Sequence, residues 1–346
     1  MREAVLYERL EDEKVRCRLC AHRCAVAPGR RGLCGVRENR SGTLFSLVYG
    51  KLISSAVDPI EKKPLYHFLP GTRSYSIATV GCNFRCDFCQ NWQISQHRPE
   101  ADDFPGTPAT PAEVAASAAR RRCATIAYTY TEPTIFWEFA RDTAVAAHGR
   151  GLANVFVTNG YQTPETVEAM TGLIDAANVD VKAFTDEFYR ANCGGRLAPV
   201  LEAVRLMHAA GIHVEITTLL IPGRNDSEEE VSKIAEFIAG LSPDVPWHVS
   251  RFHPQYKALD LDATPLSSLE RAAAAGRKAG LRYVFVGNVS GADSDTVCPG
   301  CGARVLTRVG YTTEFAALEA ADGGAKCARC GRGLAIVTGF AAPAGA

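Results

Sequence analysis

The stretch GCNFRCDFCQNW, residues 81–92, places three cysteines within eight residues and has no fourth cysteine beside them. Cys82, Cys86 and Cys89 are spaced C-x3-C-x2-C. A structural zinc site takes four protein ligands, and an ordinary 4Fe–4S cluster takes four thiolates. Three thiolates in one tight loop leave a coordination position open for an exogenous ligand. The loop therefore predicts a 4Fe–4S cluster with one open iron; the alternative is a zinc site completed by His97 or another distant residue.

The sequence after residue 73 alternates between strand-like and helix-like segments. Seven short apolar runs suit strands that are buried on both faces: SYSIATVG, TIAYTY, NVFVTNG, NVDVKAF, HVEITTLLIPG, WHVSRFHP and YVFVGN. Helix starts lie between them, for example Thr110 followed by Pro111 and Glu113. Repeated strand–helix alternation predicts a parallel sheet, either doubly wound or in a full or partial barrel. The functional groups are then expected at the carboxyl ends of the strands.

Cysteine-rich segments flank this α/β region. Eleven of the thirteen cysteines fall into three clusters, and clustered cysteines in a reducing cytosol indicate metal or redox sites rather than disulfides. We therefore divide the chain into a metal-binding module, a connecting segment, an α/β core and a second metal-binding module, at residues 1–45, 46–73, 74–290 and 291–340.

The C-terminal cluster has two C-x2-C units, in CPGCG and CARCG. Paired units of this kind are typical of zinc ribbons, and four thiolates leave no open position on the ion. The sequence predicts a structural zinc held by Cys298, Cys301, Cys327 and Cys330.

The N-terminal cluster is spaced C-x2-C-x3-C-x9-C. Four thiolates could hold zinc or an auxiliary iron–sulfur cluster, and His22 could replace one of them. Zinc would only stabilise the fold, whereas a cluster would relay electrons or bind substrate. The sequence leaves both open for Cys17, Cys20, Cys24 and Cys34.

The composition excludes several other classes of protein. The 346 residues carry no net charge, so nothing global favours nucleic acid or an acidic membrane surface. The polar N-terminus lacks the apolar core of a signal peptide, and no run is long enough to span a membrane. We expect a cytoplasmic protein without a membrane partner, for which nucleic acid is an unlikely ligand.

The three-cysteine stretch, with Phe88 directly before the third cysteine, resembles the signature of the radical S-adenosylmethionine (SAM) superfamily. The strand ends YTYTEPT, VTNG, DVK and LLIPGRND are similar to those of pyruvate formate-lyase activating enzymes. Over nearly the whole chain, CRLCAHRC, GLCGVREN and IEKKPLYHFLPGT more narrowly resemble the radical enzyme of the AmmeMemoRadiSam system. The implied fold is a partial (β/α)6 TIM-type barrel with small cysteine-rich modules at both termini.

The resemblance also implies a chemistry. SAM would chelate the open iron, and one electron from the cluster would cleave its C–S bond to a 5′-deoxyadenosyl radical that abstracts hydrogen from the substrate. The expected electron donor is a low-potential flavodoxin or ferredoxin. The favoured substrate is a protein or other macromolecule, in activase-like or modifying chemistry. The alternatives are a small-molecule substrate and a non-catalytic zinc-ribbon scaffold.

Site residues follow from the resemblance. Cys82, Cys86 and Cys89 would hold the cluster, with Phe88 against the cofactor. Glu132 would accept a hydrogen bond from the methionine ammonium of SAM, unless it is a solvated rim carboxylate.

Other strand ends have weaker assignments. Asn159 would bind the ribose hydroxyls, unless it only forms a turn with the following glycine. Asp180 and Lys182 would place the cofactor or form a plain ion pair, and Pro222 would face the adenine or simply belong to a loop. His253 would position substrate or be a hydrogen-bonded rim histidine.

One further cysteine stands apart from the clusters. Cys193, in RANCGGR, is either a functional thiol or a small buried apolar side chain.

Overall fold

A computed structural model describes residues 1–99, 103–321 and 324–342. Its centre is an eight-stranded sheet in the order β16-β15-β14-β13-β12-β11-β9-β8. The parallel strands are β9 (Arg73–Ala78), β11 (Thr125–Tyr128), β12 (Ala153–Thr158), β13 (Ala176–Asp180), β14 (His213–Leu220), β15 (Trp247–Arg251) and β16 (Val284–Gly287). β8 (Ser54–Pro59) pairs antiparallel with β9 at one edge. The seven predicted strand segments are confirmed as the parallel strands.

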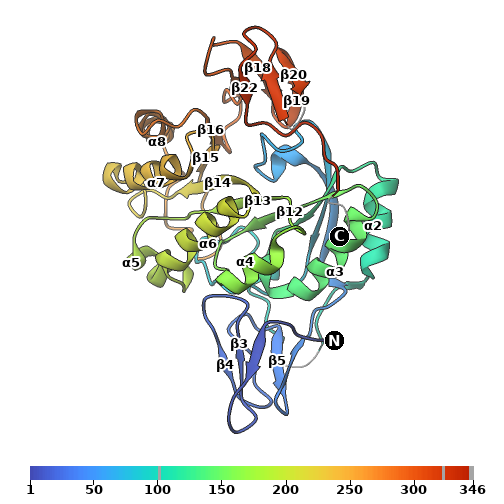
Figure 1. Cartoon of the computed structure of the whole chain (residues 1–346). Coiled ribbons are helices and arrows are strands. Elements are labelled where there is room, and N and C mark those ends of the chain that lie inside the picture. The colour runs from blue at the N-terminus through green and yellow to red at the C-terminus, as the bar shows by residue number, and fades with distance from the viewer. Residues whose placement is uncertain (100–102, 322–323, 343–346) are drawn as a thin grey trace.

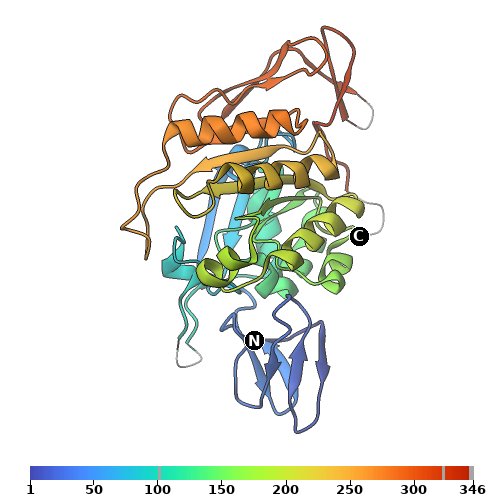
Figure 2. The same cartoon turned by 90° about the vertical axis from the view of Figure 1, so that its left-hand side faces the viewer.

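Helices connect these strands and complete the partial barrel. They are α2 (Pro111–Arg120), α3 (Trp137–His148), α4 (Pro164–Met170), α6 (Leu197–Ala209), α7 (Glu228–Leu241) and α8 (Leu266–Lys278). Figure 1 shows α4 and α6 in front of the strands, and Figure 2 shows α7 and α8 beside them from the side. The capping box of Thr110 and Glu113 at the start of α2 is confirmed. The predicted α/β fold of a partial barrel is thus confirmed, with β16 as a seventh parallel strand after six strand–helix units.

Short elements fill the connections between the main ones. They are η1 (Ile60–Lys62), α1 (Trp92–Ser95), η2 (Pro133–Phe136), α5 (Asp186–Phe188), the π-helix η3 (Tyr189–Cys193) and the small pair of β7 (Lys51–Leu52) with β10 (Thr107–Pro108).

The N-terminal module consists of two small antiparallel sheets at one end of the molecule (Figure 1). They are formed by β2 (Tyr7–Arg9), β3 (Val15–Cys17) and β4 (Ala25–Val26), and by β1 (Arg2–Glu3), β6 (Thr43–Ser46) and β5 (Arg37–Arg40). A buried ion pair between Arg37 and Glu138 of α3, with N–O distances of 2.8 and 2.9 Å, joins the module to the core. Removing one member would leave a buried charge without a partner, which is strongly destabilising.

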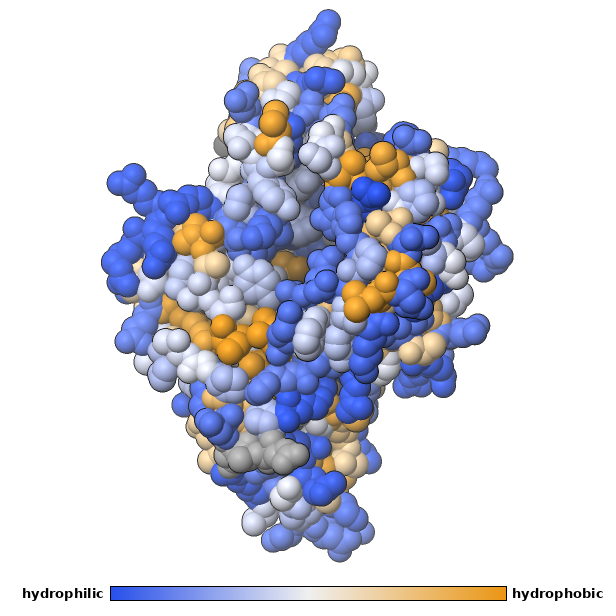
Figure 3. Space-filling view, turned by 180° about the vertical axis from the view of Figure 1, so that it is seen from behind, coloured by the Kyte–Doolittle hydropathy of each residue, from blue (hydrophilic) through white to orange (hydrophobic). Residues whose placement is uncertain are grey.

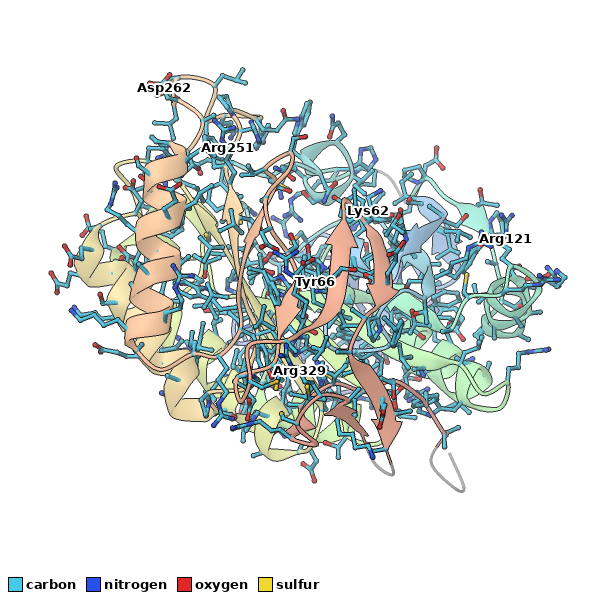
Figure 4. The ribbon with its side chains drawn as sticks, turned by 90° about the horizontal axis from the view of Figure 1, so that it is seen from above. Lys62, Tyr66, Arg121, Arg251, Asp262 and Arg329 are labelled. Carbon is cyan, nitrogen blue, oxygen red and sulfur yellow. The ribbon has the colours of Figure 1, made fainter. Side chains whose placement is uncertain are left out.

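The C-terminal module lies at the opposite end (Figure 1). It contains β17 (Thr296–Val297), β18 (Arg304–Val309), β19 (Thr312–Phe315), β20 (Leu318–Ala321), β21 (Gly324–Cys327) and β22 (Gly333–Leu334). The buried guanidinium of Arg308 donates to the carbonyl of Tyr66 at 2.7 Å. In the view from above, Tyr66 and Lys62 are labelled where the strands of this module overlie the core (Figure 4).

The connecting segment contributes a strand to the central sheet. Residues 54–59 form β8. The carboxylate of Glu215 on β14 is fully buried and accepts the backbone N–H groups of Tyr66 at 3.0 Å and His67 at 2.7 Å. These two hydrogen bonds fix the segment around Tyr66, which the C-terminal module contacts through Arg308.

Candidate active site

One cavity of about 1500 Å3, partly open to solvent, lies at the carboxyl ends of the parallel strands. Figure 3, the view from behind, shows the surface hollowed below the C-terminal module. Eight of the predicted site residues line the cavity: Cys82, Cys86, Phe88, Cys89, Glu132, Asn159, Asp180 and Lys182. Pro222 and His253 are not among its lining residues; Pro222 is half-buried and His253 is exposed.

The three-cysteine loop, residues 81–92, leaves β9 with a sharp turn. Gly81 has a φ of +95°, and a Cβ there would lie 2.6 Å from Cγ1 of Val36. Only glycine meets both the backbone and the packing requirement without strain. Further along, the N–H groups of Arg85 and Asp87 donate to the carbonyls of Cys193 at 2.8 Å and Asn192 at 3.1 Å. The loop is therefore fixed at its start by packing against Val36 and further along by hydrogen bonds to the backbone of residues 192 and 193.

Burial raises the pKa of Cys82 and Cys89 above the usual range of a thiol. The pKa of Cys86 is also raised, first by its hydrogen bond with Cys193 and then by burial. Coordination to a metal reverses this tendency, because it deprotonates a thiol outright. Cys193, which the sequence left unassigned, is thus a fully buried thiol packed against Cys86.

Glu132 is 2% exposed at the end of β11, yet both of its oxygens face hydrogen-bond donors. Its Oε1 accepts from the N–H of Thr134 at 3.0 Å and the hydroxyl of Thr158 at 2.7 Å, and its Oε2 accepts from the N–H of Asn159 at 2.8 Å. Burial raises the pKa of Glu132, and none of the described residues offers it a cation. A buried carboxylate of this kind suits a cationic ligand group.

Asn159 has two roles in the geometry. Besides its backbone bond to Glu132, its side-chain amide donates to Oδ1 of Asn83 in the three-cysteine loop at 2.7 Å. The amide nitrogen of Asn83 is buried and has no partner in the described part of the chain. Asn159 therefore connects the loop to the carboxylate that faces it.

Asp180 and Lys182 form an ion pair at the end of β13, with Nζ 2.7 Å from Oδ2. The ammonium also lies 6.0 Å from the centre of the Phe88 ring. The predicted ion pair is present, and both of its residues line the cavity.

A model of the radical SAM superfamily matches residues 76–238. The chain is 44% identical over 339 residues to the uncharacterized protein MJ0808 of Methanocaldococcus jannaschii, which covers 97% of this chain and 100% of the relative. The chain belongs to the radical SAM superfamily. A benzylsuccinate synthase activating enzyme of Thauera aromatica is 32% identical over 108 residues, which are 31% of this chain and 33% of that protein. In fold, the radical SAM methyltransferase of Sphaerobacter thermophilus matches with a TM-score of 0.51 at 18% identity, over 64% of this chain and 70% of that one.

The residues present fit the cofactors of a radical SAM protein. Three free thiols stand at one wall of the cavity, and among the described residues no three of them gather closely enough for a single ion. A 4Fe–4S cluster spaces its thiolates more widely. The cation-free carboxylate of Glu132 lies near Cys82, where an ammonium group bound beside the cluster would meet it.

A polar cluster that the sequence did not indicate borders the cavity through Lys63 and Tyr130. Nζ of Lys63 lies 2.7 Å from Oδ2 of Asp58, and the hydroxyl of Tyr130 donates to the same oxygen. Burial alone would raise the pKa of Asp58, but hydrogen bonds from Lys63, Tyr130 and Lys62 hold it well below its usual range. Tyr130 has a φ of +65°, which is uncommon away from glycine and concentrates at functional sites. A tyrosine directly before the TEPT stretch was the only sequence signal.

The C-terminal module also reaches the cavity of this radical SAM protein. Tyr311, between β18 and β19, is one of its lining residues. Nothing in the spacing of the cysteines predicted this contact.

The four C-terminal thiols form a compact group that could hold one metal ion. They all lie within 4.8 Å of one another, with Sγ distances of 3.7 Å for Cys298–Cys330 and Cys301–Cys327. A tetrahedral zinc ion with Zn–S bonds of about 2.3 Å requires sulfurs about 3.8 Å apart. This geometry suits a single metal ion and points to an additional metal site.

The part of the chain that the structure describes has no helix long and apolar enough to cross a membrane.

Proposed function

We propose that this radical SAM enzyme performs activase-like or modifying chemistry on a protein or other macromolecule. The observation that carries the radical chemistry is the three-cysteine loop facing the buried, cation-free Glu132 across one cavity. When bound, the cluster and SAM supply reductive cleavage of a C–S bond. The protein supplies placement and exclusion of water.

The residues of the chain have separate tasks in this proposal. Cys82, Cys86 and Cys89 hold the cluster, and Oε2 of Glu132 accepts a hydrogen bond from the ammonium of SAM. Asn159 keeps Glu132 and the loop in register through its two hydrogen bonds.

Five other assignments are less direct. Phe88, Asp180 and Lys182 border the cofactor space, as their place in the cavity wall supports. Pro222 and His253 stay predictions, as contacts to adenine and substrate that would form outside the cavity wall.

A macromolecular substrate is supported by the mouth of the cavity. The hairpin of β18 and β19 carries three exposed apolar side chains, Val309 at 85%, Tyr311 at 50% and Phe315 at 52% exposure. Tyr311 lines the cavity as well. Exposed apolar side chains that gather in one place are typical of docking surfaces. Three relatives carry the words "activating enzyme" in their names, which supports activase-like chemistry.

Four narrower features belong to this proposal. They are membership in the AmmeMemoRadiSam group, a flavodoxin or ferredoxin as electron donor, zinc as the C-terminal metal and a cytoplasmic location. A small-molecule substrate is the alternative, since a cavity of about 1500 Å3 has room for a second small ligand. The scaffold alternative requires a barrel without iron.

The test asks whether the substrate is found among the large or the small molecules of a cell extract. Anaerobic extract of the source organism is separated by ultrafiltration, and each fraction is added to reconstituted enzyme with SAM and dithionite. We expect the retained fraction to stimulate 5′-deoxyadenosine formation, and protease treatment of that fraction to abolish the stimulation for a protein substrate. Stimulation by the filtrate alone would contradict the proposal and favour a small molecule.

A further inference from the structure

The four N-terminal cysteines line a cavity of their own, separate from the central one. Cys17 ends β3, and Cys34 lies in the turn before β5; both are 7% exposed. Apolar side chains such as Leu19, Val26 and Ile135 close the remaining wall. All four thiols are free, so the site is ready for a metal centre: Cys17, Cys20, Cys24 and Cys34.

The spacing of the thiols discriminates between the two metal centres that the sequence allows. Among the described residues, the C-terminal cysteines are the one group of three or more potential ligands whose atoms all lie within 4.8 Å of one another. The N-terminal four do not gather in this way, and neither do the thiols of the three-cysteine loop. A single zinc ion needs sulfurs about 3.8 Å apart, whereas a 4Fe–4S cluster holds them farther apart. Like the thiols of the three-cysteine loop, the N-terminal thiols are therefore spread too widely for a single zinc ion, in contrast to the C-terminal four.

The alternative ligand His22 is engaged elsewhere. Its Nε2 is 2.8 Å from the carbonyl of Asn83, and its ring packs against Tyr161 with centroids 4.8 Å apart. This contact favours four thiolates as the complete ligand set.

We propose that Cys17, Cys20, Cys24 and Cys34 hold a second 4Fe–4S cluster, which relays electrons to the cluster of the three-cysteine loop. Four thiolates leave no open iron, so the second site has no place for SAM. One electron would pass from a reduced low-potential protein donor through this site to the loop, and no bond forms or breaks in this transfer. The relay rests on the proposed radical function, whereas the metal assignment stands without it.

A single layer of residues separates the two sites. A Cβ on Gly81, next to Cys82, would lie 3.0 Å from the carbonyl oxygen of Cys34. Nearby, His22 lines the N-terminal cavity and contacts Asn83 of the loop. Thr134, whose backbone N–H bonds Glu132, also lines the N-terminal cavity. These contacts place the second site directly behind the loop and the carboxylate that faces it.

The metal assignment is tested without altering the N-terminal module. The variant Cys82→Ala/Cys86→Ala/Cys89→Ala is reconstituted with iron and sulfide, and iron, sulfide and zinc are measured together with Mössbauer spectra. We expect about four iron atoms of the 4Fe–4S type per chain in the variant and about eight in the wild type. Cys123→Ala, at a buried cysteine outside the clusters, should match the wild type. A variant without iron but with a second zinc would overturn the proposal.

The relay is tested with Cys24→Ser. We expect it to lose the second cluster's spectrum while keeping its C-terminal zinc, which reports an intact fold. Reduction of the loop cluster by reduced flavodoxin, followed by EPR, should slow at least about tenfold, whereas dithionite should still support SAM cleavage. An unchanged rate with flavodoxin would overturn the relay. Loss of cleavage even with dithionite in the wild type would instead contradict the radical function.

Discussion

The backbone N–H of Asn159 donates to Oε2 of Glu132 over 2.8 Å, so the ends of β11 and β12 meet at one buried carboxylate. The hydroxyl of Thr158 donates to the other oxygen at 2.7 Å. The carboxylate is thereby fixed in orientation before any ligand arrives. Preorganised groups of this kind bind at a lower entropic cost.

Removing the negative charge of Glu132 should weaken SAM binding. Glu132→Gln keeps the shape but removes the charge-assisted hydrogen bond to the ammonium, and its amide nitrogen faces the N–H of Asn159. We expect the affinity for SAM, measured by calorimetry on the reconstituted enzyme, to fall about 10- to 100-fold. Glu187→Gln, at an exposed glutamate of α5, is the control and should bind like wild type. If the wild type and both variants bound SAM with equal affinity, Glu132 would not be part of the cofactor site.

Gly81→Ala should disturb both iron sites at once. Its φ of +95° costs an alanine about 1–2 kcal/mol, and the added Cβ would meet Val36 at 2.6 Å, which adds about 1–3 kcal/mol of overpacking. Gly172→Ala is a matched control, because its φ is +78° and a Cβ there meets nothing within 4 Å. Urea unfolding should show a clearly larger loss of stability for Gly81→Ala. Equal losses of stability for Gly81→Ala and Gly172→Ala would show that the loop and the N-terminal module are not closely packed at Gly81.

Removing one C-terminal thiol should release zinc and leave iron in place. Cys327 is fully buried, and structural zinc contributes directly to folding of small modules. Cys327→Ser should lose the C-terminal zinc and expose residues 291–342 to limited proteolysis, with Cys123→Ser as control. Retention of one zinc per chain, or a parallel loss of iron, would contradict a separate structural ion.

Acid should destabilise the fold through His67. Burial lowers the pKa of His67 to about 3 from a usual value of 6.5. Below pH 6.5, the unfolded chain therefore binds a proton at this histidine that the folded chain does not bind. The free energy of unfolding should fall by up to about 1.4 kcal/mol per pH unit as the pH drops below 6.5. His67→Phe has no such group, so its urea midpoint should fall less between pH 6.5 and 5.5. Parallel declines in both proteins would show that His67 does not titrate this way.

Local sequence patterns predicted much of this protein because the relevant residues are close together in the chain. The apolar runs defined the parallel strands, and the C-x2-C pairs defined the C-terminal site. The strand ends brought Glu132 and Asn159 to one cavity, because parallel strands share an edge.

The remaining features depend on contacts between distant segments. Asp58 meets Lys63 and Tyr130 only because β8 joins the edge of the sheet and the backbone of Tyr130 turns left-handed. Cys193 reaches Cys86 only because the π-helix η3 packs under the loop. No spacing or periodicity carries such information.

The most direct measurement is 5′-deoxyadenosine formation. Wild type and Cys86→Ala are purified without oxygen, reconstituted with iron and sulfide, reduced with dithionite and given SAM. We expect the wild type to form product and Cys86→Ala to form none. Equal product from both proteins, or a wild type that binds only zinc at the three-cysteine loop, would contradict it.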